Sequence, residues 1–132
     1  MRKISKFFTI KKSINTFLLS GLLLTFSCEQ YTFDPPTIDP GVQISFQTDI
    51  QPLFTSKCIA CHASGNRQPS LDAANSYTAL TTGGYISADP VNSPETSILY
   101  QQITTGSGHV SILNDIQKLT ILEWIRQGAN NN

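Results

Sequence analysis

The sequence lacks an apolar run long enough to cross a bilayer, and it is poor in charged residues. Its longest apolar stretch, residues 14–26, is interrupted by polar residues and falls short of the about 20 residues that a membrane-spanning helix needs. Charged residues make up only 14% of the 132 residues. From Cys28 onward, four basic residues stand against nine acidic ones, which leaves a net charge of −5. A nucleic-acid-binding surface needs the opposite sign, so the sequence excludes that class of partner.

Basic residues are concentrated before the apolar stretch. Five of the nine Lys and Arg residues lie in the first twelve positions, and residues 14–26 follow them. A cationic head followed by a short apolar segment is typical of a secretory signal peptide. We therefore expect residues 1–27 to be a signal peptide and the protein to be exported, with a short buried helix as the alternative.

The end of this segment has no small-x-small cleavage site of the ordinary kind. Leu24-Thr25-Phe26-Ser27-Cys28 instead resembles a bacterial lipobox, with Thr25 where Leu is usual. The resemblance implies cleavage before Cys28 and acylation of that residue, which would anchor the protein to a lipid membrane in the periplasm or at the outer-membrane surface. It also explains an odd cysteine in an exported chain, for which a spare thiol is the alternative.

The next stretch contains three prolines. Residues 28–44 contain Asp34-Pro35-Pro36 and Asp39-Pro40-Gly41, and proline fixes its own φ and restricts the residue before it. We expect an extended tether over residues 28–44 and a folded domain over residues 45–132.

The domain shows helical signals and no convincing two-residue alternation for strands, which predicts an all-α fold of about four helices with long loops. Thr48 or Asp49 is predicted to cap a first helix that runs to about Cys58, with Pro52 in its first turn. A short helix is expected around residues 75–80. Ser93-Pro94-Glu95 predicts a third helix that ends near Ile103.

The last helix has the clearest signals. Asn114 and Gln117 form a capping-box pattern, and Ile121, Leu122, Trp124 and Ile125 fall on one face at helical spacing. Gly128 is predicted to end this helix as a C′ residue. A domain of this size buries a limited core, so we expect another group to fill its centre.

Cys58-Ile59-Ala60-Cys61-His62 is the C-x-x-C-H pattern of c-type haem attachment. Two thiols three positions apart near a helix end can reach the two vinyl groups of a porphyrin, and the next residue, His62, can bind the iron. The pattern therefore predicts one covalent haem c.

Other readings of these residues stay open. Cys58 and Cys61 could form a disulfide in an oxidising compartment, or act as a thioredoxin-like redox pair, although such a pair precedes its helix. Cys58, Cys61, His62 and His109 could also bind zinc, but adjacent Cys61 and His62 would turn awkwardly onto one ion.

The pattern Phe46-x-x-Asp49-Ile50-x-Pro52-Leu53-Phe54-x-x-x-Cys58-x-x-Cys61-His62 resembles the opening of class I c-type cytochrome domains. It is closest to the Planctomycete-type cytochrome c domain of exported bacterial proteins, to whose middle and closing helices residues 89–100 and 121–129 are similar. The resemblance covers about residues 45–129. It implies a small cytochrome c-like fold, with first and last helices crossing beside the haem. It also implies electron transfer to redox partner proteins rather than enzymatic catalysis.

The sixth iron ligand is where the sequence departs from that family. Family members commonly use a Met in the loop before the last helix, but the only Met here is Met1, inside the predicted signal peptide. His109 lies in that loop and is the only His besides His62. We therefore expect His62 and His109 to be the two axial metal ligands, which should lower the reduction potential relative to Met ligation. The alternative is an exposed loop His109 and an open sixth site.

Two other functions remain as alternatives. An open sixth site would suit a haem enzyme or a sensor of gases or peroxide, whereas a disulfide or zinc would suit a non-haem accessory module. Arg67, Tyr77, Tyr85 and Trp124 are candidates for hydrogen bonds to the haem propionates, although ordinary surface or core packing is the more common role of such residues.

Overall fold

The computed structural model describes residues 34–39 and 41–132 of the chain. Within these residues all regular structure is helical and there is no strand, which confirms the predicted all-α class. The predicted signal peptide and Cys28 lie outside the described residues. In the part that is described, none of the helices has both the length and the apolar character needed to cross a membrane.

The elements follow one another as four helical segments, with a short 3-10 turn before the third. A continuous first segment runs through η2 (Phe46–Ile50), α2 (Gln51–Leu53), η3 (Phe54–Cys58) and α3 (Ile59–His62). The others are α4 (Ser76–Thr82), the 3-10 turn η4 (Pro94–Thr96) with α5 (Ile98–Thr105), and α6 (Asp115–Arg126).

The first segment alternates π-helical and α-helical turns around Pro52. Proline has no backbone N–H to give to the preceding turn, and its ring collides with a carbonyl of that turn in a regular α-helix. In η2 the hydrogen bonds span five residues, as in the bond from the Gln51 N–H to the Phe46 carbonyl. These wider turns make room for Pro52 without ending the segment.

The predicted boundaries of this segment were wrong. Ser45 is its N-cap, because the Ser45 Oγ accepts the Thr48 N–H at 3.3 Å and the Ser45 N–H donates to Asp49 Oδ2 at 2.8 Å. Thr48 and Asp49 therefore lie inside the first turn, and Pro52 lies beyond it. The segment also continues past Cys58 to His62, so the two cysteines belong to its last turns.

The third predicted helix is divided in two at Ser97. This residue has an extended backbone (φ −61°, ψ 128°), is fully buried, and accepts the Ser87 N–H on its Oγ at 2.9 Å. The long-range bond holds Ser97 out of helical geometry, so α5 begins only at Ile98 and ends at Thr105 rather than Ile103. Pro94 does occupy the start of η4, but Ser93 makes no side-chain cap.

The last helix is confirmed in detail. The Asn114 Oδ1 accepts the Gln117 N–H at 2.9 Å, and the Gln117 Oε1 accepts the Asn114 N–H at 3.0 Å, which is the predicted capping box. Gly128 follows the helix with φ +96°, a left-handed conformation that favours glycine. The short helix expected around residues 75–80 is also present as α4.

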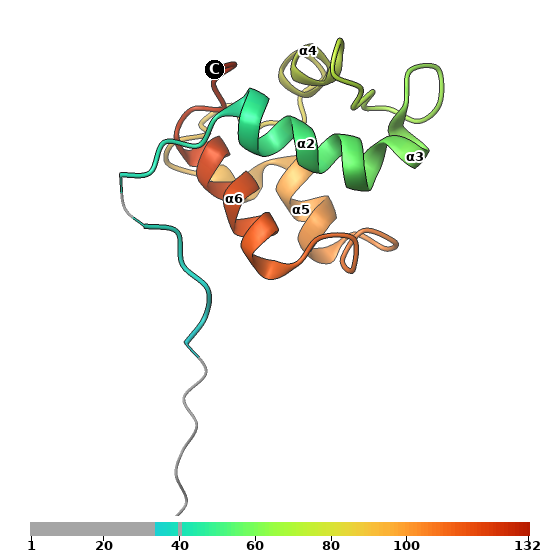
Figure 1. The fold of residues 1–132 in the computed structure, drawn as a ribbon. Helices are drawn as coiled ribbons and strands as arrows, with labels where there is room; N and C mark the ends of the chain where they lie inside the picture. The colour runs from blue at the N-terminus through green and yellow to red at the C-terminus, as the bar shows by residue number, and fades with distance from the viewer. Residues whose placement is uncertain (1–33, 40) are drawn as a thin grey trace, which may run out of the picture. The chain divides into compact units, whose positions relative to one another are not determined.

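The first segment crosses α6, and α5 packs beside α6 (Figure 1). Phe46 of η2 lies at the crossing, with its ring centre 5.3 Å from those of both Trp124 and Tyr77. The largest wholly buried apolar side chains of the core are Phe46, Ile50, Phe54, Leu80, Ile121, Trp124 and Ile125. These contacts fix the orientation of the first segment, whose far end carries Cys58, Cys61 and His62.

The residues just before the first segment contact the domain. Ile44 is buried, Ile38 packs against the core, and the Gln127 Nε2 donates to the Val42 carbonyl at 2.8 Å. The C-terminal part of the stretch predicted as a tether therefore lies against the helices.

Candidate functional site

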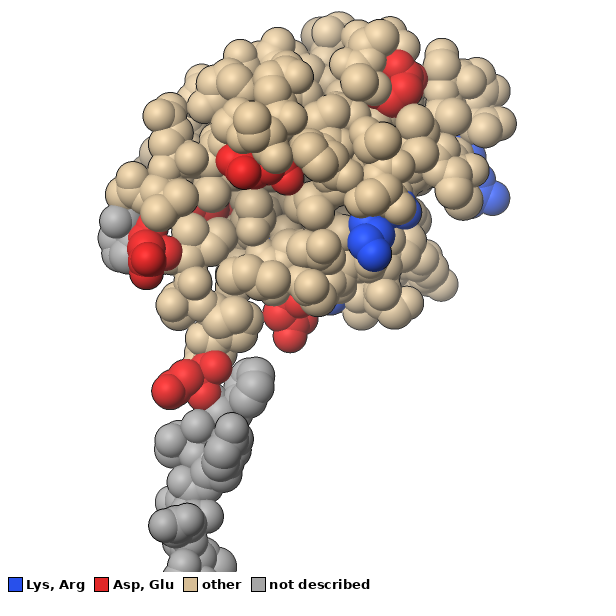
Figure 2. All heavy atoms as spheres, viewed as in Figure 1, with Lys and Arg blue, Asp and Glu red and all other residues tan. Residues whose placement is uncertain are grey.

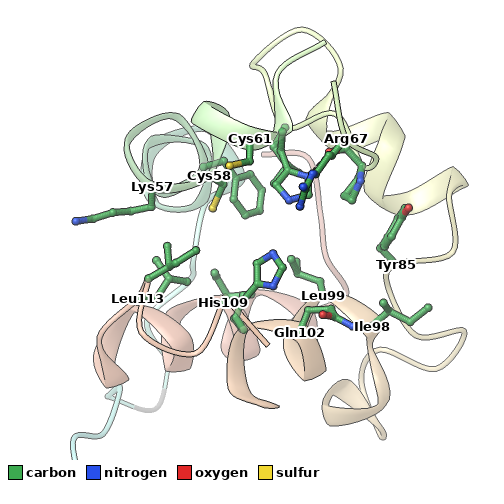
Figure 3. A pocket seen from close by; sticks show the side chains of 18 of the residues that line it. Lys57, Cys58, Cys61, Arg67, Tyr85, Ile98, Leu99, Gln102, His109 and Leu113 are labelled. Carbon is green, nitrogen blue, oxygen red and sulfur yellow. Dashed lines mark hydrogen bonds between the residues drawn. The ribbon is translucent and has the colours of Figure 1, made fainter. Parts of the chain in front are cut away.

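A pocket of about 400 Å³ lies between the end of the first helical segment, α5 and the loop before α6. Its size falls in the range of small-molecule sites. Its apolar walls include Phe54, Leu71, Leu99, Ile103, Leu113 and Ile121. Cys58, Cys61, His62 and His109 all line this pocket, so the structure brings the four predicted haem-site residues together. Figure 3 shows His109 pointing into the space that Cys58 and Cys61 border from the other side.

The two cysteines lie about one helical turn apart at the end of the first segment, and both thiols are free. Cys58 is half-buried and Cys61 is exposed. Burial raises the pKa of the Cys58 thiol above its ordinary value, because a thiolate loses solvation there. The structure thus holds two uncombined thiols at one edge of the pocket, and no disulfide joins them.

The His62 ring is oriented by a backbone carbonyl. Its Nδ1 lies 3.0 Å from the Pro69 carbonyl oxygen. Because that oxygen can only accept, the Nδ1 carries the proton and donates it, which leaves the Nε2 as the free nitrogen. Such a bond fixes the ring and raises the basicity of the nitrogen that binds a metal.

The loop after α3 folds back so that Pro69 reaches His62. The Leu71 N–H donates to the His62 carbonyl at 2.7 Å, and the Arg67 N–H donates to the Cys61 carbonyl at 3.4 Å. Both bonds satisfy carbonyls that the end of a helix leaves without partners.

His109 approaches from the opposite wall, on the loop between α5 and α6. Its N–H donates to the Gly106 carbonyl at 3.1 Å, and Gly108 before it has φ +83°. The His109 Nδ1 is buried and has no hydrogen-bond partner. Because that nitrogen is enclosed by protein, the Nε2 is the nitrogen that His109 offers to the pocket.

The two imidazoles are spaced to share one metal ion. Their ring centres lie 6.0 Å apart, with an angle of 46° between the ring planes. A metal–imidazole bond is about 2 Å long and the ring centre lies about 1 Å behind the nitrogen, so two imidazoles on opposite sides of one ion have centres about 6 Å apart. The donor set and the apolar pocket therefore fit a haem, which His62 and His109 would hold through its iron.

The zinc alternative finds no support in the arrangement of side chains. Among the described residues, no group of three or more His, Cys, Asp or Glu side chains is placed to hold a metal ion. A structural zinc site needs four such ligands, whereas haem iron receives four of its ligands from the porphyrin and needs only two from the protein.

The four candidates for propionate contacts separate into two pairs. Arg67 and Tyr85 line the pocket. Tyr77 and Trp124 do not line it, because Tyr77 packs on Phe46 and the Trp124 indole N–H donates to the Asn130 carbonyl at 2.9 Å. Tyr77 and Trp124 therefore have the packing role that the sequence favoured, and they do not lie where propionates could be contacted.

The structure adds Lys57 and Pro69, which sequence reasoning missed. Lys57 and Arg67 are the only charged residues among those that line the pocket, and both are cationic. On the face shown in Figure 2, Lys and Arg gather toward one side of the molecule, while Asp and Glu are spread over the rest. Pro69 also lacks any sequence signal, because it acts through a backbone carbonyl that every residue has.

Comparisons with protein-family models, with curated proteins and with solved structures find no match to this chain. The C-x-x-C-H motif and the geometry of the pocket are therefore what indicate a function.

Proposed function

We propose that this chain is an exported mono-haem c-type cytochrome that carries electrons. Cys58 and Cys61 hold the haem through two thioethers, and His62 and His109 are its axial ligands. The observation that carries the proposal is the pair of imidazoles, with ring centres 6.0 Å apart, in an apolar pocket bordered by two free thiols.

Attachment is an addition reaction. Each thiol gives its sulfur to one vinyl carbon and its proton to the other, so a C–S bond forms, the S–H bond breaks and no oxidant is needed. The placement of Cys58 and Cys61 in successive turns of one helical segment supports the proposal, because it presents both sulfurs to the same edge of the pocket.

The protein's part in electron transfer is to keep the site closed and unchanged between redox states. Haem iron supplies one-electron chemistry. His62, oriented by the Pro69 carbonyl, and His109 would hold the iron from the two sides of the pocket, and the apolar side chains that line the pocket would limit the access of water. A closed iron favours a carrier over an enzyme or a gas sensor, which would need a vacant position.

The finer fold assignment belongs to the same proposal. A cytochrome c-like fold places the first and last helices across one another beside the haem. The crossing of the first segment with α6 at Phe46 and Trp124 supports that assignment. Acylation of Cys28 would attach this domain to a membrane, where its partners are other redox proteins.

The experiment uses protein from the periplasm of a host that attaches c-type haem. A haem stain on a denaturing gel should label the chain, because only covalently bound haem survives denaturation. The native ferrous spectrum should change little when carbon monoxide is added, since both axial positions are filled. An unstained band would contradict haem attachment, and a large spectral change with carbon monoxide would contradict bis-His ligation.

A further inference from the structure

Two buried polar side chains, those of Gln51 and Ser76, do not line the pocket. Gln51 of α2 is 7% exposed and Ser76 of α4 is 0% exposed. Buried polar groups are stable only when hydrogen-bonded, so the partners of these two side chains indicate what the pair holds in place.

Gln51 joins three parts of the fold. Its Oε1 accepts a hydrogen bond from the Ser76 Oγ, which connects α2 to α4. Its Nε2 donates to the Leu71 carbonyl at 3.2 Å and to the Thr55 Oγ1 at 3.3 Å. The bond to Leu71 fixes the end of the loop that follows α3.

Leu71 is itself hydrogen-bonded to the last residue of α3, His62. Its N–H donates to the His62 carbonyl at 2.7 Å, and the carbonyl of Pro69, two positions earlier, accepts the His62 Nδ1–H at 3.0 Å. Gln51 thus holds Leu71, which bonds the His62 backbone and lies two positions after the Pro69 that bonds the His62 ring. Within the described residues, Gln51 is the side chain that donates to the Leu71 carbonyl.

We propose that Gln51, held in its rotamer by Ser76, is a positioning residue for the axial ligand His62. It keeps residues 63–71 folded against α3, so that the Pro69 carbonyl stays on the His62 Nδ1–H. The proposal rests on the proposed haem ligation by His62, and it assigns to Gln51 an effect on the iron without contact to the haem.

The electronic consequence has a definite sign. A hydrogen bond from the Nδ1–H to a carbonyl raises the basicity of the coordinating nitrogen and favours ferric iron, which lowers the reduction potential. If the loop loosens, the bond weakens and the potential rises. A residue with a purely structural role would change stability but leave the potential unaltered.

The test compares Gln51→Met, Ser76→Ala and the control Gln47→Met in the haem-loaded protein. Met has nearly the length of Gln but cannot donate to Leu71, and Ser76→Ala is a milder second variant that keeps this donor. Gln47 lies in the same helical segment but is exposed, and its Nε2 bonds Asn131 at 2.9 Å. The two readouts are the reduction potential and the solvent exchange of the His62 Nδ1–H by NMR.

In Gln51→Met we expect a more positive potential and about tenfold faster exchange of the Nδ1–H, as for the loss of one buried hydrogen bond. Ser76→Ala should shift both readouts in the same direction by less, and Gln47→Met should match the wild type. If Gln51→Met and Ser76→Ala both bind haem and keep the wild-type potential and exchange rate, the positioning role is wrong while the cytochrome proposal stands. A wild-type protein without covalent haem overturns both proposals.

Discussion

The imidazole rings of His62 and His109 lie with their centres 6.0 Å apart, although one residue belongs to α3 and the other to the loop between α5 and α6. The two rings differ in the hydrogen bonding of their Nδ1 atoms. The His62 Nδ1 is bonded to the Pro69 carbonyl, whereas the His109 Nδ1 is buried without a partner. In the proposed haem site the two imidazoles would therefore not contribute equally to the electronic state of the iron.

Replacing His109 changes the iron in two distinguishable ways. His109→Met should raise the reduction potential, because a thioether is a weaker donor than imidazole and favours ferrous iron. His109→Ala should open the sixth position, so that carbon monoxide binds to the ferrous protein. Redox titration and optical spectra measure these effects, with Ser111→Ala in the same loop as the control. Unchanged spectra and potential in both variants would show that His109 does not bind the iron.

Each cysteine should account for one thioether. Cys58→Ala or Cys61→Ala should leave one vinyl group conjugated with the porphyrin, which moves the pyridine haemochrome band to longer wavelength. The double variant should lose haem on denaturation. Cys28→Ser is the control at the third cysteine, and it should keep the wild-type band because Cys28 precedes the domain predicted over residues 45–132. A wild-type band in either single variant would contradict attachment through both sulfurs.

The capping box of α6 predicts a measurable contribution to stability. Asn114→Ala removes the side chain that accepts the Gln117 N–H, and it should lower the free energy of unfolding by about 1 kcal/mol. Chemical denaturation of the haem-loaded protein measures this. Asn66→Ala, an exposed change in the loop after α3, should stay within about 0.5 kcal/mol of the wild type. Equal effects from the two variants would contradict the assigned cap.

The hydrogen bonds of Asp72 predict that the free energy of unfolding depends on pH in the acidic range. Hydrogen bonds from Ser70 and Asn75 lower the pKa of Asp72 from its ordinary value of 3.8, with Ser70 the largest cause. The folded state therefore favours the carboxylate. The resulting stabilisation is present above the unfolded pKa, about 3.9, and disappears as pH falls through the lower folded pKa.

Denaturant titrations of the wild type and Asp72→Asn at neutral and acidic pH test this sign. The wild type should be the more stable at pH 7, with the difference shrinking as the solution is acidified below the unfolded pKa. Ser70→Ala should reduce the pH dependence, because it removes the main donor. A difference that grows toward acid pH would be the opposite of the expected result.

The parts of the fold that could be predicted from sequence are those set by neighbouring residues. The last helix was predicted well because Asn114, Gln117 and Gly128 act within one turn of its ends. The start of the first helix was missed because the side chain that bonds the Ser45 N–H belongs to Asp49, four residues later, whereas the usual capping box has a spacing of three. The break at Ser97 depends on a bond to Ser87, which local pattern cannot show.

In the candidate site, too, the residues that form a local sequence pattern could be predicted and the others could not. Cys58, Cys61 and His62 form a contiguous motif, and His109 followed from the absence of a Met after position 1. The Pro69 carbonyl could not be predicted, because a backbone carbonyl has no side-chain signature. Gln51 could not be predicted either, because it lies outside the motif that it is proposed to position. The polar N–H of Trp124 made this residue a candidate for propionate contacts, but that N–H donates to the Asn130 carbonyl within the core.

The most direct measurement is the mass of the tryptic peptide Cys58–Arg67 from protein matured in a haem-attaching periplasm. Trypsin cleaves after Lys57 and Arg67, so this one peptide contains both cysteines and His62. The peptide should carry the added mass of one complete haem, with no free thiol left to alkylate. A peptide of unmodified mass, with both thiols alkylated, would contradict haem attachment and with it the proposed electron-carrying function.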